Sequence, residues 1–295
     1  MNGAPALRHS AHGFSRWRTG AAGREAIGAL VTALAVAGAV AVLVPFAWML
    51  ITSLKGPGEL MAIPPRWIPQ EWRWDNYARA WQAAPFGRFF LNTAVVAGTS
   101  VAGQIVTATL AGYALARMRF RGRQTVLAAI LATMAIPGEA TLIPAYLLMR
   151  DLGWVDTYLA LIVPNLAGAF GIFLMRQAMV ALPRALEDAA FMDGASRWTF
   201  VWRVAAPLCR PTMATLALLT FLGQWNSYLW PLIVTNSEAL RPVQIGLRYF
   251  INQELGNDWA LLMAGSVLVA VPTVVAFLAA QRQFIEGLAA GAVRG

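Results

Sequence analysis

Residues 183–211 read PRALEDAAFMDGASRWTFVWRVAAPLCRP, a polar interruption between stretches that are apolar enough to sit in lipid. Pro183 suits the first turn of a helix, where its missing N–H costs nothing. Gly194 allows the chain to leave that helix with a positive φ, and Ser196 suits the N-cap of a second helix. The segment also carries three acids and four arginines, which are Glu187, Asp188, Asp193, Arg184, Arg197, Arg203 and Arg210. We therefore predict a helix, a glycine bend and a second helix, held between membrane spans.

The second helix has a single apolar stripe, because Trp198, Val201, Trp202 and Ala205 fall at i, i+3, i+4 and i+7. Two interpretations of the segment remain open from the residues alone. It could be an interfacial loop whose tryptophans rest at the level of the lipid headgroups. It could also be a docking surface for a cytoplasmic partner, which would approach closely over small residues, namely Ala189, Ala190 and Gly194.

The composition is that of an integral membrane protein. Of the 295 residues, 58% are hydrophobic and only 13% are charged, about half the charge of a soluble domain. The net charge of +9 does not indicate nucleic acid as a partner, because the arginines are scattered between apolar runs. A single cysteine, Cys209, excludes an intrachain disulfide and a thiolate cluster. His9 and His12 lie near the N-terminus, far from any acid pair, so no metal site is expected.

Six spans of about 20 apolar residues can be drawn, and each is long enough to cross a bilayer. They cover residues 27–51, 89–116, 125–148, 158–179, 212–234 and 259–280. We expect an all-α membrane protein with six transmembrane helices in residues 24–285, surrounded by lipid. Residues 1–23 are expected to form a disordered cytoplasmic tail, and residues 286–295 a cytoplasmic C-terminal tail.

The basic residues predict the orientation. With the N-terminus inside, 15 of the 23 lysines and arginines fall on the cytoplasmic side, as the positive-inside rule requires. The clearest anchor is RMRFRGR at residues 117–123, with four arginines in seven positions. Both termini and the segment 183–211 are therefore predicted to be cytoplasmic, although five basic residues in the loop 52–88 run against the rule.

Two places in the spans could line a substrate path. Glu139 is an acid inside a predicted span, in MAIPGEATLIP, and an intramembrane carboxylate is expensive enough to indicate a function. The alternative is that Glu139 lies near the outer interface and caps backbone freed by Pro137-Gly138. The run Gln224, Trp225, Asn226 and Tyr228 places amides beside aromatic rings, which suits sugars. The alternative is that the Gln and Asn side chains form hydrogen bonds between helices.

No nucleotide site is present in the sequence. A P-loop needs a lysine followed by serine or threonine after a glycine, and the only lysine, Lys55, follows Leu54. We therefore expect no cofactor in this chain and no enzymatic activity of its own. If a nucleotide drives transport, another polypeptide hydrolyses it.

The spacing of the segment resembles a known motif. Asp188-Ala189-Ala190, Gly194, Val204 and Pro207 match Glu-Ala-Ala-x3-Gly-x9-Ile-x-Leu-Pro, the signature loop of ABC-importer permeases. Every spacing agrees, with Asp188 in place of Glu, Val204 in place of Ile and Ala206 in place of Leu. RMRFRGR at 117–123, Trp225-Asn226 and the ending at 281–295 are similar to the second permease subunit of carbohydrate importers, the maltose-type and glycerol-3-phosphate-type systems.

This resemblance implies a type I ABC-importer permease in a bacterial inner membrane, translocating a sugar or polyol. It further implies a heterodimer with a homologous permease, a pair of ABC ATPase subunits that hold ATP and Mg, and an extracytoplasmic solute-binding protein. The residues expected to couple to the ATPases are Glu187, Asp188, Ala189, Ala190, Asp193, Gly194, Ala195 and Pro207. We call residues 183–211 the coupling segment.

Two alternatives stay open. The cargo could be anionic, such as glycerol-3-phosphate, with Arg241 or Arg248 near the entrance. The chain could also be a stand-alone ion-coupled carrier or a membrane enzyme, for which Glu139 would be the proton-carrying or catalytic group.

Overall fold

The computed structural model describes residues 16–251 and 258–292, and this part of the chain is helical, with no strand in it. The longest helices are α1 (Arg16–Ser53), α4 (Phe86–Arg117), α12 (Arg210–Trp225) and α15 (Trp259–Ala292). The other α-helices are α2 (Pro57–Leu60), α3 (Asp75–Gln82), α5 (Arg123–Thr133), α6 (Gly138–Asp151), α7 (Tyr158–Ile162), α8 (Ala169–Ala181), α9 (Arg184–Met192), α10 (Arg197–Phe200), α11 (Ala206–Leu208), α13 (Leu229–Val234) and α14 (Val243–Gly246). The short turns are η1 (Val163–Asn165), the π-helical η2 (Val201–Ala205), η3 (Glu238–Leu240) and η4 (Leu247–Phe250).

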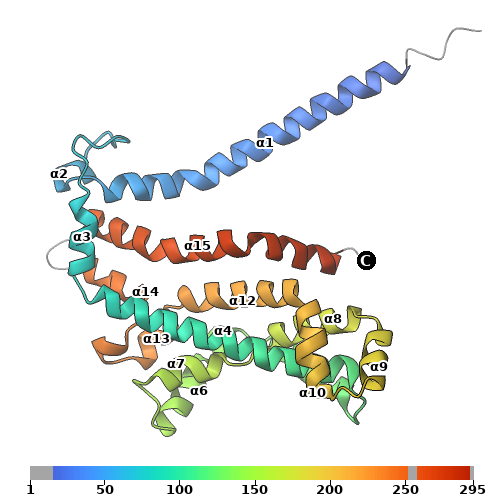
Figure 1. Cartoon of the computed structure of the whole chain (residues 1–295). Coiled ribbons are helices and arrows are strands. Elements are labelled where there is room, and N and C mark those ends of the chain that lie inside the picture. The colour runs from blue at the N-terminus through green and yellow to red at the C-terminus, as the bar shows by residue number, and fades with distance from the viewer. Residues whose placement is uncertain (1–15, 252–257, 293–295) are drawn as a thin grey trace, which may run out of the picture.

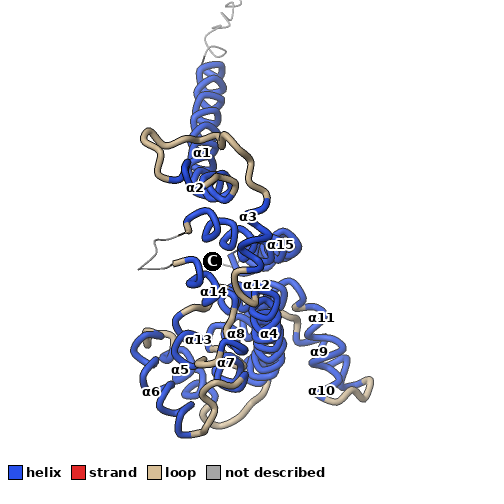
Figure 2. The backbone as a smooth tube through the Cα atoms, turned by 90° about the vertical axis from the view of Figure 1, so that its left-hand side faces the viewer, coloured by secondary structure: helices blue, strands red, loops and turns tan. Residues whose placement is uncertain are grey.

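The length and hydropathy of the helices are those expected of an integral membrane protein. Four helical stretches are long and apolar enough to cross a bilayer: residues 25–53 of α1, α4, α7 with α8, and α15. Two bent helix pairs raise the possible number to six. Figure 1 shows α1, α15, α12 and α4 running along the long direction of the molecule, with α9 and α10 at the end where α15 finishes. Figure 2, turned by 90° from the view of Figure 1, looks nearly along α4, α12 and α15.

The third span was predicted as one continuous helix over residues 125–148, but in the structure it is broken. It is bent by 100° between α5 and α6, and residues 134–137 separate the two helices. Pro137 is the N-cap of α6, and it cannot donate a backbone hydrogen bond to continue α5. The break that Pro137-Gly138 indicated in the sequence is therefore confirmed, and it is sharper than a kink.

The fifth span also differs from the prediction over 212–234. α12 ends at Trp225, and the chain resumes as the short α13 after three residues. At its start, α12 makes an angle of 81° with the preceding residues 197–208. Pro211 lies in the first turn of α12, where a proline is tolerated. The membrane-crossing part is thus shorter than expected and is flanked by bends on both sides.

Small residues bring α4 and α8 together. A Cβ added at Gly112 of α4 would lie 2.8 Å from the backbone nitrogen of Arg176 and 2.9 Å from the Cβ of Met175, both in α8. Further along α4, Thr107 donates a hydrogen bond to the carbonyl of Leu166 at 2.7 Å. A buried cluster including Met175, Met179, Phe200 and Leu216 continues from this contact to α10 and α12. The coupling segment is therefore joined to the bundle through the packing of α4 on α8.

The ends of the chain extend the terminal helices. α1 begins at Arg16, so residues 16–23, expected to be disordered, are helical, and residues 1–15 lie outside the described residues. α15 continues to Ala292 through most of the expected tail 286–295, whose last three residues lie outside the described part. None of the most apolar window of α1 is buried in this chain.

Candidate functional site

The first helix of the coupling segment is α9, which follows Pro183 as predicted and ends at Met192. Gly194 has a φ of +82°, a left-handed conformation that glycine adopts without strain. The amide of Ala195 donates to the carbonyl of Ala190 at 2.9 Å, and the amide of Asp193 donates to Ala189 at 2.9 Å. These bonds use carbonyls that the end of a helix leaves free, so the glycine bend is confirmed.

The second helix begins where the sequence predicted it. The Oγ of Ser196 accepts a hydrogen bond from the amide of Thr199 at 3.1 Å, which makes Ser196 the N-cap of α10. The apolar stripe is only partly as predicted. Val201 and Ala205 are buried, whereas Trp198 is 64% exposed and Phe200 is buried in its place. One turn of π-helix over Val201–Ala205 widens the helix by one residue and accounts for the shifted stripe.

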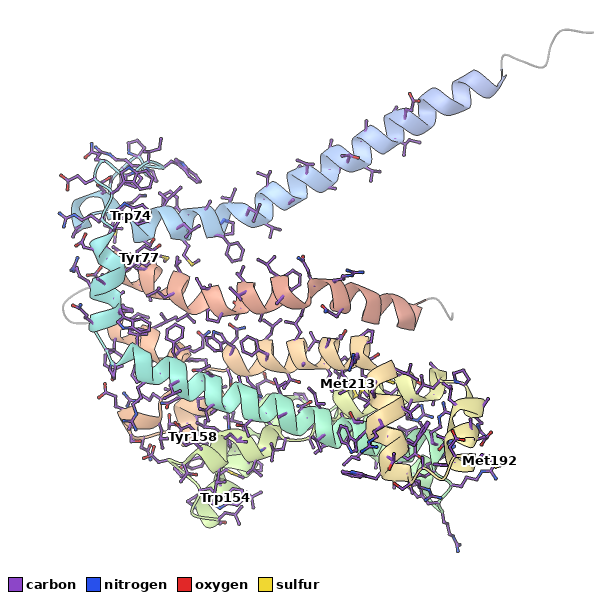
Figure 3. All side chains as sticks on the ribbon, in the orientation of Figure 1. Trp74, Tyr77, Trp154, Tyr158, Met192 and Met213 are labelled. Carbon is purple, nitrogen blue, oxygen red and sulfur yellow. The ribbon has the colours of Figure 1, made fainter. Side chains whose placement is uncertain are left out.

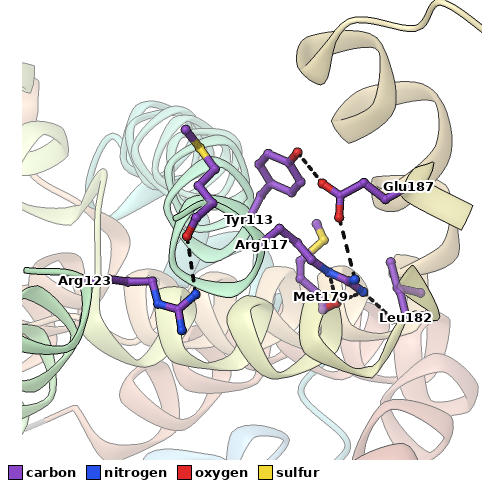
Figure 4. A network of polar contacts seen from close by, with 7 residues as sticks. Tyr113, Arg117, Arg123, Met179, Leu182 and Glu187 are labelled. Carbon is purple, nitrogen blue, oxygen red and sulfur yellow. Dashed lines mark hydrogen bonds and ion pairs between the residues drawn. The ribbon is translucent and has the colours of Figure 1, made fainter. Parts of the chain in front are cut away.

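Glu187 ties α9 to α4. The hydroxyl of Tyr113 donates to Oε1 of Glu187 at 2.8 Å, and Nη1 of Arg117 lies 3.7 Å from Oε2 (Figure 4). The side chains of Arg117 and Glu187 are 5% and 15% exposed. Because the pair is largely shielded from water, each charge depends on the other and on its hydrogen bonds.

Arg117 also holds the end of α8. Its Nε and Nη2 donate to the carbonyl of Met179 at 3.0 and 2.7 Å, and Nη2 donates to the carbonyl of Leu182. These carbonyls lie at the C-terminal end of α8, where the last carbonyls of a helix lack the usual intrahelical partner. The carbonyl of Met179 also accepts the amide of Leu182 at 3.4 Å. We call Tyr113, Arg117 and Glu187, with these two carbonyls, the α9 anchor. It joins α4, α8 and α9 at one point.

Tyr113 and Arg117 were not predicted as site residues from the sequence. Arg117 was used only to orient the chain, and Tyr113 was not singled out. The signal was present, because residues 113 and 117 are four apart in a helix and therefore lie on one face. What the sequence does not reveal is that Glu187, 70 residues further along the chain than Arg117, meets that face.

The remaining coupling residues divide into exposed and packed groups. Asp188, Ala189 and Gly194 are exposed, and so is Asp193, the C-cap of α9. Ala190 packs against the buried cluster of α8 and α10, and Ala195 and Pro207 are half-buried. Met192 is 88% exposed at the tip of the segment (Figure 3). A Cβ at Gly194 would meet nothing within 4 Å, so the space beside it is open in this chain.

The residues expected on a substrate path are not brought together at one site. Glu139 is exposed in the first turn of α6, after the bend, where a carboxylate complements the free amides of a helix start. Gln224 lines a cavity of only about 10 Å³ with Thr93, Ser227 and Trp230, and Glu139 does not line it. That volume holds roughly one water molecule, so it does not admit a sugar.

Trp225 belongs to the core rather than to an open surface. It is 4% exposed, and its Nε1 donates to the carbonyl of Val269 at 3.0 Å. Its prediction as a residue of an open substrate path therefore does not agree with its burial in this chain. Asn226 and Tyr228 are exposed, and Oδ1 of Asn226 accepts from Gln244 at 3.2 Å. Within the described residues, no group of three His, Cys, Asp or Glu side chains could hold a metal ion.

The sequence comparisons assign the family. Residues 104–284, which contain the α9 anchor and the coupling segment, match the profile of the binding-protein-dependent transport system inner membrane component. The chain belongs to this family. It is a permease subunit of an ABC importer, and such subunits are not themselves enzymes.

Curated relatives of this permease match along most of their length. The arabinooligosaccharides transport system permease protein AraQ of Halalkalibacterium halodurans is 33% identical over 85% of this chain and 91% of the relative. The diacetylchitobiose uptake system permease protein NgcG of Streptomyces coelicolor is 29% identical over 94% and 92%. The sn-glycerol-3-phosphate transport system permease protein UgpE of Yersinia pestis is 31% identical over 86% and 92%.

A solved structure confirms the fold of the permease. A chain of a bacterial ABC transporter involved in the import of the acidic polysaccharide alginate superposes with a TM-score of 0.80 at 26% identity, covering 88% of this chain and 97% of that one. A second alginate transporter chain, solved in complex with an alginate pentasaccharide-bound periplasmic protein, gives a TM-score of 0.62 at 17% identity. The all-α permease fold predicted from the sequence is therefore confirmed.

Proposed function

We propose that this permease couples through the exposed face of α9 to a pair of ABC ATPase subunits, which bind ATP and Mg. The observation that carries the proposal is the α9 anchor. It links an exposed helix, with Asp188 and Ala189 on its surface, to the inner helices α4 and α8. A force applied to α9 by a closing ATPase pair is thereby passed to both helices. A homologous second permease completes the membrane pathway.

The cargo is a sugar or a related polyol, delivered by an extracytoplasmic binding protein. The support comes from relatives named for diacetylchitobiose and arabinooligosaccharides. Asn226 and Tyr228 add exposed amide and phenol groups beside α12, which suit a hydroxylated ligand. Since the cavity at Gln224 holds roughly one water molecule, passage of a sugar requires the helices to move or a second subunit to contribute.

The coupling segment and both termini face the cytoplasm of a bacterium, and the chain crosses the inner membrane. Two observations support this orientation. Arginines are concentrated at 117–123, as on cytoplasmic surfaces. In Figure 1, α9 and α10 lie at the same end of the bundle as the end of α15 and the beginning of α1.

A second candidate cargo is an anionic polyol such as glycerol-3-phosphate. Arg241 and Arg248 line an open pocket of about 350 Å³ with Thr235 and Tyr249. One relative is named for sn-glycerol-3-phosphate. Uptake assays with matched plain and phosphorylated polyols separate the two cargoes, and Arg248→Gln should reduce uptake of the phosphorylated compound alone.

Crosslinking tests the coupling proposal. Met192→Cys, at an 88% exposed position, and Trp74→Cys, at a 66% exposed position at the other end of the bundle, form a matched pair (Figure 3). In membranes containing the whole importer, a short thiol crosslinker at residue 192 should capture a nucleotide-hydrolysing subunit, and one at residue 74 should not. Capture from residue 74 and not from residue 192 would refute the proposal.

A further inference from the structure

A strongly basic pocket lies where α4 turns into α5. It has a volume of about 760 Å³, and it is lined by Arg117, Arg119, Arg121, Arg123 and Arg184 together with the first turn of α5. We call it the basic pocket. Four of its arginines lie between the last residue of α4, Arg117, and the first residue of α5, Arg123. The fifth, Arg184, is the first residue of α9.

No carboxylate of the described part of the chain lines the basic pocket. Arg117 is paired with Glu187 in the α9 anchor, and Arg119 and Arg184 also border an adjoining pocket that Asp188 lines. Arg121 and Arg123 border only the basic pocket. Among the described residues, neither of them makes an ion pair with an acid. The pocket therefore holds an excess of positive charge that the described residues do not neutralise.

The start of α5 adds hydrogen-bond donors to the same pocket. Gly122 is the N-cap of this 11-residue helix, has a φ of +83° and has no side chain with which to cap it. The first amides of a helix have no partner within the helix, and they favour anions. Gly122, Gln124 and Thr125 all line the pocket. Guanidinium groups and helix amides together are the donors that bind phosphate oxygens.

The pocket lies at the ends of two candidate membrane spans. It is placed where the apolar span α4 ends at Arg117 and where the next span begins with α5 at Arg123. Phe120, in the turn between them, is 42% exposed, and it lines the pocket beside the arginines. An exposed aromatic ring among arginines at the end of a span suits the boundary between headgroups and acyl chains.

We propose that the basic pocket binds the phosphate of an anionic phospholipid headgroup, with Arg121, Arg123 and Arg184 as its ligands. Because Arg184 begins α9, Arg121 lies between α4 and α5, and Arg123 begins α5, one bound lipid joins the coupling segment to the second and third spans. Lipid binding at this pocket does not depend on which solute is transported.

The test compares lipid binding by two full-length variants that lose the same number of charges. The first is Arg121→Gln/Arg123→Gln/Arg184→Gln. The control is Arg16→Gln/Arg18→Gln/Arg24→Gln, which removes three arginines from α1, predicted to lie on the same side of the membrane. Phosphatidylglycerol and phosphatidylcholine are titrated separately onto each protein in detergent, and bound lipid is counted by native mass spectrometry.

Each basic residue near an anionic membrane surface strengthens binding by about fivefold. The pocket variant should therefore bind phosphatidylglycerol on the order of 100-fold more weakly than the wild type, and the control should bind it as the wild type does. Arg121→Gln alone should lose about fivefold, which keeps the test informative if the triple variant does not fold.

Any of the following results would overturn the proposal. One is an equal loss in the control variant, which would assign the effect to total charge. Another is equal binding of phosphatidylglycerol and phosphatidylcholine by the wild type, or displacement of the lipid by millimolar inorganic phosphate. The third is unchanged lipid binding by the pocket variant together with loss of a co-purifying protein, which would make the pocket a protein contact.

Discussion

At the scale of single residues, Glu187 decides how the coupling segment is held. The sequence predicted Glu187 as part of the coupling site, and its position in α9 could be read from the residues around it. Its partners could not, because Tyr113 and Arg117 belong to a helix that only the tertiary fold brings near. The carboxylate is 15% exposed, so its removal leaves the Arg117 guanidinium without a countercharge.

Replacing Glu187 separates charge from hydrogen bonding in the α9 anchor. Glu187→Ala should lower the free energy of unfolding by about 1–3 kcal/mol, because it leaves Arg117 and Tyr113 without their partner. Glu187→Gln keeps an acceptor for Tyr113 and should lose less. Thermal unfolding of the purified protein in detergent measures both, and Asp188→Ala, at an exposed neighbour without a described ion pair, is the control. Equal effects at residues 187 and 188 would contradict the anchor.

Asp156 plays a comparable part at the other end of the bundle. It lies between α6 and α7 with a φ of +60°, a conformation that Asp and Asn tolerate better than most residues. Its Oδ1 accepts hydrogen bonds from the amides of Asn236 and Ser237 and from the hydroxyl of Ser237, each at 2.9 Å. These bonds, led by the one from the Ser237 amide, lower the pKa of Asp156 below its usual 3.8.

The sign of the pH dependence follows from this lowered pKa. Folding favours the ionised carboxylate, so the stabilisation is complete above the unfolded pKa of 3.8 and is lost as the pH falls through the folded value. Asp156→Asn keeps a side-chain oxygen that can accept these hydrogen bonds, and it keeps the backbone preference, but it cannot ionise. It should reduce stability at pH 7 by about 1 kcal/mol, and the difference from the wild type should shrink below about pH 4. A difference that grows on acidification would contradict this assignment.

At the scale of elements, the sequence predicted the membrane helices well and their breaks poorly. Hydrophobic length located α1, α4 and α15 because long apolar runs have few other solutions in lipid. The 100° turn between α5 and α6 was visible only as Pro137-Gly138, since a proline indicates a break but not its angle. The π-helical turn at η2 left no signal, and the burial of Phe200 in place of Trp198 follows from it.

The approach of α4 to α8 gives the sharpest test at this scale. Gly112→Ala would place a Cβ 2.8 Å from the Arg176 nitrogen, so the helices must separate, at a cost of about 1–3 kcal/mol. Gly98→Ala, in the same helix, meets nothing within 4 Å and should be neutral or slightly stabilising, because alanine favours helices. The thermal unfolding midpoints of the two variants check this. Equal midpoints would mean that α8 can move away at no cost.

At the scale of the whole molecule, the chain is one part of a transporter, and its surfaces reflect this. The most apolar window of α1 is not buried in this chain, and it is covered by lipid or by another subunit. The sequence alone could not show which coupling residues are exposed, because Ala189 and Ala190 are the same residue type and differ only by their place on α9. Ala190 packs against the buried cluster, whereas Ala189 is exposed.

Substitutions of Gly194 test whether this glycine is needed for the turn after α9 or for a contact with an ATPase subunit in the assembled importer. Gly194→Asn accepts the left-handed conformation at low cost, whereas Gly194→Ala is strained there. If an ATPase subunit sits against residue 194, both variants should uncouple ATP hydrolysis from uptake, because both add a side chain to a space that is open in this chain. If the glycine serves the turn alone, Asn should support normal uptake. Uptake and ATPase rates in proteoliposomes, measured on the same preparation, decide between the two.

The length of α4 has a mechanical consequence. Its 32 residues extend about 48 Å at 1.5 Å per residue, and the α9 anchor grips it at one tip. Treated as a stiff lever arm pivoting at that tip, a tilt of about 5° would sweep the opposite tip by about 4 Å. A small rotation of α4 about the α9 anchor would thus move the other end of this helix, on the opposite side of the bilayer, by several ångströms.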